Sequence, residues 1–177
     1  MNAVSLMIKS YFDENEWKYE LEENEEEKID TFQTGFNLKN ESVNIFVRVF
    51  TDREVYKIIG FSDSSKVPMA SINGGLRAVN KINQSLIQGC FFLDTDDGTI
   101  GFFSGTHTDG LTFSEETFGA SFHTAIECLD SEVAQIIKNA VIFEPPVAQP
   151  APTLVVTPKD SATTKRRSLL SRLFRRK

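Results

Sequence analysis

The stretch Gly89–Gly105, GCFFLDTDDGTIGFFSG, constrains the fold more than any other part of the sequence. Two short apolar runs, Cys90–Leu93 and Ile100–Phe103, flank the polar segment Asp94–Thr99, which contains an Asp-Gly step. Aspartate and glycine tolerate the positive φ angles of a tight turn, so the stretch predicts a β-hairpin. A helical pattern precedes it and a longer one follows. We therefore expect the hairpin to lie in a sheet against which both helices pack.

Three segments place apolar residues at the spacing of one helix face. They are Ala3–Glu14, Met69–Leu86 and Ser114–Val141, the last of which starts at Ser114 or at a capping box of Thr112 and Glu115. The middle segment contains Gly74 and Gly75, which each cost a helix about 1 kcal/mol relative to alanine. Two interpretations stay open: a late helix start after Gly75, which we favour, or close approach of another backbone.

Before the second helix, the chain shows a strand pattern in three or four places: Trp17–Glu22, Ile29–Leu38, Ser42–Thr51 and Glu54–Phe61. Short turns at Asn40–Glu41 and Asp52–Arg53 make neighbouring strands antiparallel. The acidic run Glu22–Glu27 is interpreted as a solvated turn, with a partner-binding loop as the alternative, and Ser62–Lys66 as a loop. Residues 1–143 are thus predicted to form one α+β domain in the order α-β-β-β-(β)-α-β-β-α, with an antiparallel sheet of five or six strands.

Two of these strands carry apolar residues on both faces, whereas a sheet with one solvated face alternates apolar and polar residues. Val43, Ile45, Val47 and Val49 make one clean apolar face of their strand. We expect the other surface to be covered by a second copy of the chain or by a bound peptide, because it would otherwise leave a large apolar patch. Its candidate residues are Phe46, Phe50, Tyr56 and Ile58, although the pattern does not fix which face of the second strand continues the Phe46 side.

Charge and composition divide the chain near residue 144. Residues 144–177 hold eight Lys/Arg against two Asp/Glu, while residues 1–143 hold eleven against twenty-three. An acidic body disfavours nucleic-acid binding, which needs a basic surface. Residues 144–164 contain five prolines and are predicted to be a disordered, extended linker.

Residues 165–177, KRRSLLSRLFRRK, form a basic tail with an amphipathic pattern at about 100° per residue. Its candidate binding residues are Arg166, Arg167, Leu169, Leu170, Arg172, Leu173, Phe174, Arg175 and Arg176. Such a segment suits an anionic membrane surface. There are three alternatives: binding to an acidic protein, such as the body of this same chain; binding to nucleic acid; or no specific role.

The sequence offers little catalytic or metal chemistry, and we predict neither catalytic nor metal-binding residues and no cofactor. His107 is interpreted as a loop residue and His123 as a residue at the edge of the core, since neither has a second His or a Cys at ligand spacing. The aspartates before Gly98 do not match a calcium loop. Cys90 and Cys128 are expected to be reduced core residues. No apolar run reaches the length of a membrane span or of a signal sequence, so we expect a cytoplasmic protein, peripheral at the inner face of the membrane where its tail binds lipid.

Several segments together resemble the YbjN family of bacterial domains: Val79–Asn83, Gly89–Asp94, Asp97–Ile100 and Leu111–Thr112. That family's fold is similar to type III secretion chaperones, which are small acidic homodimers that hold an extended segment of a partner. The resemblance covers residues 43–142 and implies a non-enzymatic, chaperone-like or adaptor-like protein-binding module that acts as a homodimer. A regulatory or sensory domain recruited to membrane by its tail is the alternative, and an enzyme is a more distant one.

Overall fold

The computed structural model describes residues 1–53, 55–107 and 114–143, and the predicted linker and basic tail lie outside these residues. The elements in chain order are α1 (Ala3–Glu14), β1 (Glu20–Asn24), β2 (Ile29–Asn37), β3 (Ser42–Phe50), β4 (Val55–Lys66), the 3-10 turn η1 (Met69–Ser71), α2 (Ile72–Asn83), β5 (Cys90–Leu93), β6 (Thr99–His107) and α3 (Glu115–Ile142). Ser114 caps α3, since its side chain accepts a hydrogen bond from the backbone N–H of Thr117.

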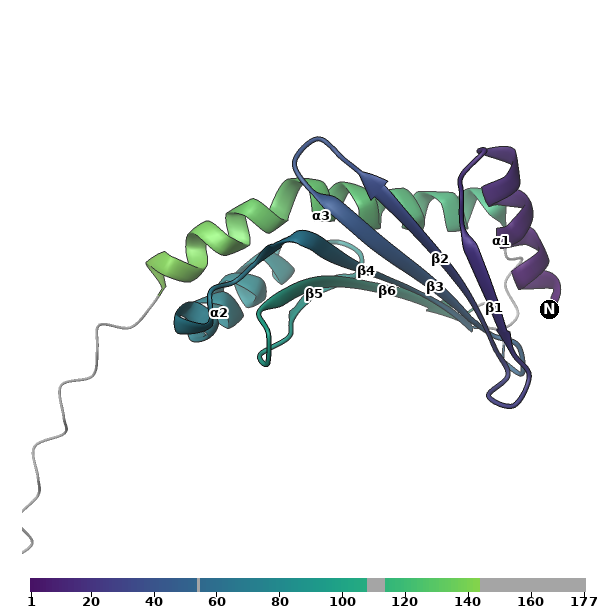
Figure 1. Ribbon diagram of the computed structural model, residues 1–177, viewed down its shortest axis with the longest axis horizontal. Coiled ribbons are helices and arrows are strands. Elements are labelled where there is room, and N and C mark those ends of the chain that lie inside the picture. The colour runs from purple at the N-terminus through teal and green to yellow at the C-terminus, as the bar shows by residue number, and fades with distance from the viewer. Residues whose placement is uncertain (54, 108–113, 144–177) are drawn as a thin grey trace, which may run out of the picture. The chain divides into compact units, whose positions relative to one another are not determined.

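The strands form one six-stranded sheet in the order β1-β2-β3-β4-β6-β5, in which every neighbouring pair is antiparallel (Figure 1). This confirms the predicted α+β fold with its antiparallel sheet and terminal helices. The β5–β6 hairpin also forms as predicted: Gly98 has a φ of +76°, and its N–H donates to the carbonyl of Asp94 at 2.9 Å.

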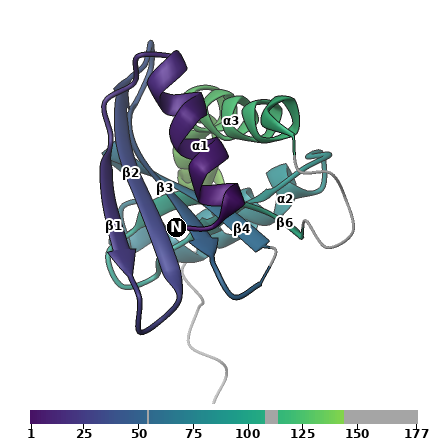
Figure 2. The same ribbon diagram turned by 90° about the vertical axis from the view of Figure 1, so that its right-hand side faces the viewer.

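All three helices pack on the same face of the sheet, which we call the inner face (Figure 2). Phe12 of α1 meets Phe32 of β2 with ring centroids 5.8 Å apart. Leu129 of α3 covers Gly60 so closely that a Cβ there would lie 2.5 Å from it. The helices thus cover the apolar face that β3 presents with Val43, Ile45, Val47 and Val49, all buried. The opposite, outer face has no helix over it among the described residues.

An aromatic cluster fills the end of the core where α1 meets α3. Trp17 stacks on Phe122 with ring centroids 5.3 Å apart and also contacts Tyr11 and Phe36. Because Trp17 packs into this cluster, β1 begins at Glu20, later than its alternating pattern predicts. The first part of the acidic run then belongs to the strand, which corrects its interpretation as a turn.

The segment Ser62–Lys66, predicted as a loop, continues β4 through a bulge. Its serines have a buried partner: Glu41 is 5% exposed and accepts hydrogen bonds from the hydroxyls of Ser62 at 2.8 Å and Ser64 at 2.5 Å. A buried carboxylate is costly unless it is hydrogen-bonded. This tertiary contact, which no local pattern reveals, holds the polar segment in the sheet.

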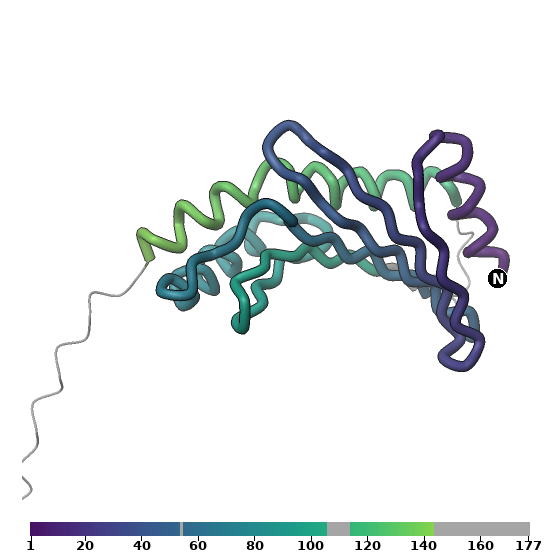
Figure 3. The backbone as a smooth tube through the Cα atoms, viewed as in Figure 1, coloured from purple at the N-terminus to yellow at the C-terminus, as the bar shows by residue number. Residues whose placement is uncertain are grey.

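Gly74 and Gly75 both lie inside α2, so the favoured late helix start is wrong and the close-approach alternative is correct. A Cβ on Gly74 would lie 1.9 Å from the carbonyl oxygen of Ala140 in α3. Figures 1 and 3 show α2 beside the C-terminal half of α3. The missing side chain therefore lets the two helix backbones touch.

Candidate functional site

Aromatic side chains gather on the outer face, across β3, β4, β6 and β5. The register places Phe46, Ile59 and Phe103 in one row, and Phe61 and Phe92 in the next row on either side of Gly101. The ring of Phe61 makes edge contacts with Phe46 at 5.9 Å and with Phe92 at 5.7 Å between centroids. We call these five residues the outer-face belt. All five are half-buried, so they pack on one another and still present apolar surface.

The structure divides the four residues predicted to form a partner or dimer surface. Phe46 and Phe50 lie on the outer face, but Tyr56 and Ile58 lie on the inner face, where they are 1% and 0% exposed. The outer face of β4 is instead formed by Val55, Lys57, Ile59 and Phe61. Tyr56 and Ile58 are therefore corrected to core residues.

The sequence did contain the information that identifies the outer face of β4. A two-residue turn at Asp52–Arg53 pairs the residues that flank it, and this register places Ile59, and not Ile58, opposite Phe46. Phe92 and Phe103 were missed for a different reason. Their strands neighbour β4 only through the long connection that contains α2, and no turn length fixes that pairing.

Two cations interrupt the apolar surface between Phe50 and the outer-face belt. Arg48 and Lys57 are direct cross-strand partners. The Lys57 ammonium lies over the ring of Phe50, 5.1 Å from its centroid, and 5.9 Å from that of Phe103. Neither cation forms an ion pair within residues 1–53, 55–107 and 114–143. Across β3 and β4, the outer face is thus apolar with two basic side chains, in a domain whose overall charge is negative. Glu20 and Glu22 lie on the same face at the β1 edge.

The two edges of the sheet are protected from strand addition. At β5, the Asn83 side chain bonds the backbone of Phe91, accepting from its N–H at 2.7 Å and donating to its carbonyl at 2.9 Å. At the other edge, β1 reads Glu-Leu-Glu-Glu-Asn, and charged residues disfavour pairing with another chain. The accessible apolar surface of the sheet therefore lies on the outer face and not along an edge.

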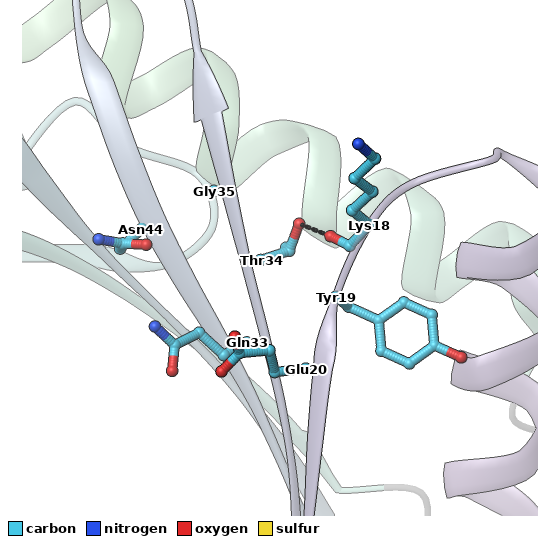
Figure 4. A pocket seen from close by; sticks show the side chains of 7 residues that line it. All are labelled: Lys18, Tyr19, Glu20, Gln33, Thr34, Gly35 and Asn44. Carbon is cyan, nitrogen blue, oxygen red and sulfur yellow. Dashed lines mark hydrogen bonds between the residues drawn. The ribbon is translucent and has the colours of Figure 1, made fainter.

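A polar hollow of about 340 Å³ lies where β1 diverges from β2 (Figure 4). Thr34 donates a hydrogen bond to the backbone carbonyl of Lys18 there, at 2.8 Å. The residues lining it are Lys18, Tyr19, Glu20, Gln33, Thr34, Gly35 and Asn44. This set contains no nucleophile beside a general base, so the hollow does not support catalysis.

A second hollow, of about 580 Å³, lies between α1 and the first turns of α3. The Tyr11 hydroxyl lies 3.1 Å from Nε2 of His123. Burial, and to a smaller extent the carboxylate of Glu115, raise the pKa of Tyr11, so its hydroxyl stays protonated. His123 also packs edge-on against Trp17, which confirms its place at the edge of the core.

Two aspartates of the β5–β6 turn accept hydrogen bonds within the turn, and one of them also accepts from Lys66 of β4. Asp94 accepts from the N–H of Asp96, and Asp97 accepts from Thr99 and from Lys66. Within the described part of the chain, no group of three or more His, Cys, Asp or Glu residues is arranged to hold a metal ion. The backbone of His107 ends β6 and pairs with Val55, which corrects its predicted place in a loop. Its side chain and all of Asp109 lie outside what the structure describes.

The two cysteines differ in environment. Cys90 is exposed on the outer face of β5, which corrects its predicted place in the core, while Cys128 of α3 is half-buried against the core. Burial is the main cause that raises the pKa of the Cys128 thiol, followed by the neighbouring Glu132 and Glu127. Among the helices of the described residues, none is long and apolar enough to cross a membrane.

These features define an α+β domain with helices on one face of a six-stranded antiparallel sheet and, on the other, an aromatic belt beside the cations Arg48 and Lys57. No protein-family model matches the sequence, so the resemblance to the YbjN family receives no support there, and no curated protein matches it either. Among solved structures, the chain is similar to one in the HopA1-SchA chaperone-effector complex, at 12% identity and a TM-score of 0.40. The match covers 73% of this chain and 94% of the other. A likeness of this degree does not establish a shared function.

Proposed function

We propose that this protein is a non-enzymatic, chaperone-like or adaptor-like module that holds a segment of a partner protein on the outer face of its sheet. The observation that carries the proposal is the outer-face belt, five half-buried apolar side chains with no helix of the described residues above them. Contiguous exposed apolar surface of this kind marks protein interaction sites. Aromatic anchors also supply much of the energy of protein interfaces.

The test is a capture experiment from the native cell with the intact protein. Phe46→Thr combined with Phe61→Thr removes two rings of the belt and keeps residues that favour strands. Ile87→Thr is the matched control, because Ile87 is an exposed apolar residue in the loop between α2 and β5. We expect the wild type and the control to retain the same partner and the double variant to lose it, with unchanged circular dichroism. Equal capture by all three proteins would contradict the proposal.

We further propose that the module acts as a homodimer, as its resemblance to secretion chaperones implies. Apolar residues flank the contact between α2 and α3: Met69, Leu76, Val141 and Ile142 are 42% to 65% exposed. Sedimentation velocity of the intact protein tests this. We expect a dimer that Leu76→Glu weakens and that the control Leu6→Gln, in exposed α1 surface, leaves intact. A monomer at micromolar concentration would contradict it.

The alternative function is recruitment to an anionic membrane surface through residues 165–177. These residues lie outside the described part of the chain, so their sequence alone supports this function. Partner binding on the outer face and membrane recruitment by the tail are compatible, because they use separate residues.

A further inference from the structure

We propose that the segment held on the outer face is acidic and amphipathic, with apolar side chains on the outer-face belt and carboxylates against Arg48 and Lys57. This inference rests on the proposed function and adds the chemistry of the partner. The supporting observation is that Arg48 and Lys57 are paired on neighbouring strands. The fold of the domain alone does not explain this pairing.

Arg48 and Lys57 are directly opposite each other on neighbouring strands. Like charges in this position destabilise a sheet, so a fold gains nothing from the pair by itself. Acidic residues outnumber basic ones by about two to one in residues 1–143, yet none forms an ion pair with either cation in the described residues. Glu22 and Glu27 share with Arg48 a hollow of about 130 Å³, but they lie beyond ion-pair distance from it.

The position of Lys57 suits an external carboxylate. Its ammonium is held over the ring of Phe50 and near that of Phe103, so the charge is fixed at the surface between two aromatic side chains. A preorganised cation loses little freedom when it binds an anion. A carboxylate placed there would neutralise the repulsion between Arg48 and Lys57 while its neighbours cover the belt.

The same charges disfavour a second copy of this chain as the occupant. A symmetric dimer uses the same patch on both subunits. Stacking two outer faces would place Arg48 and Lys57 of both copies in one interface, and like charges that share an interface disfavour association. An acidic partner of different sequence is favoured by both the apolar and the charged part of the surface.

The probe is a short synthetic helical peptide with leucine on one face and glutamate on the other, compared with the peptide in which every glutamate is lysine. Binding to the intact protein is followed by an environment-sensitive fluorophore on Cys90, which is exposed on the outer face beside the belt. We expect the glutamate peptide to change the Cys90 signal and the lysine peptide to bind at least about tenfold more weakly.

Arg48→Glu combined with Lys57→Glu should lower affinity for the glutamate peptide about tenfold or more. The control Lys138→Glu makes the same kind of charge change on the exposed surface of α3, and should have less than about a twofold effect. The basic tail is present in the wild type and in both variants, so its attraction for the glutamate peptide is the same throughout this comparison of proteins.

Equal effects of the two sets of substitutions, or binding of both peptides alike, would overturn the acidic partner while leaving the proposed function standing. Binding without a change at Cys90 would overturn the outer face as the site. If the double variant instead abolishes or strengthens self-association and leaves peptide binding unchanged, the occupant is a second copy. The proposed function is tested separately by the capture experiment. It fails if the Phe46→Thr, Phe61→Thr double variant still retains the captured partner.

Discussion

The Asp97 carboxylate fastens the β5–β6 turn by bonds to Lys66 and Thr99. The Lys66 ammonium, followed by the hydroxyl and N–H of Thr99, lowers the pKa of Asp97 from 3.8 to about 2. Because the folded state has the lower pKa, the stabilisation is present above about pH 4 and is lost as the pH falls through about 2. As the pH falls from about 4 to about 2, the free energy of unfolding measured with urea should therefore decrease less for the Asp97→Asn variant than for the wild type. Asp96→Asn is the control, and an unchanged pH dependence in Asp97→Asn would contradict the prediction.

The two thiols should react at different rates, because only Cys90 is exposed and burial raises the pKa of Cys128. The thiolate is the reactive species, so a raised pKa and restricted access both slow Cys128. With a disulfide reagent on the native protein at neutral pH, we expect a fast and a slow phase of thiol release. Cys90→Ser should remove the fast phase and Cys128→Ser the slow one. A single phase in the wild type would show that the two environments are equivalent.

At the scale of elements, the α2–α3 contact depends on the absence of a side chain at Gly74. Alanine normally stabilises a helix interior relative to glycine. At this position its Cβ would overlap the carbonyl oxygen of Ala140, so Gly74→Ala should destabilise the domain by about 1–3 kcal/mol. Asn80→Ala, on the exposed face of the same helix, should have no such cost. The prediction fails if urea unfolding finds Gly74→Ala as stable as the wild type.

Elements whose formation depends on local pattern were predictable from the sequence. Turn chemistry at Gly98 gave the hairpin, and periodicity gave α1 with its observed bounds. The errors lie where a tertiary contact outweighs local preference. Ser62–Lys66 joins the sheet because buried Glu41 bonds its serines, and Trp17 leaves β1 because aromatic rings surround it. The outer face was only partly predictable. Because β4 has apolar residues on both sides, its pattern alone does not show which side faces the core, and this depends on its register with β3.

In the whole molecule, residues 165–177 carry the basic tail, and their apolar residues Leu169, Leu170, Leu173 and Phe174 share one arc of a helical wheel. Each basic residue near an anionic lipid surface contributes about 1 kcal/mol, and the apolar side chains add shallow insertion. The intact protein should therefore co-sediment with anionic vesicles and not with neutral ones. Leu173→Glu with Phe174→Glu should abolish binding, because insertion is lost and the two new carboxylates repel the anionic lipid. Arg48→Glu with Lys57→Glu should leave vesicle binding unchanged, since we propose that these two residues bind a protein partner and not lipid. Equal vesicle binding by a chain truncated after Phe143 would refute membrane recruitment by the tail.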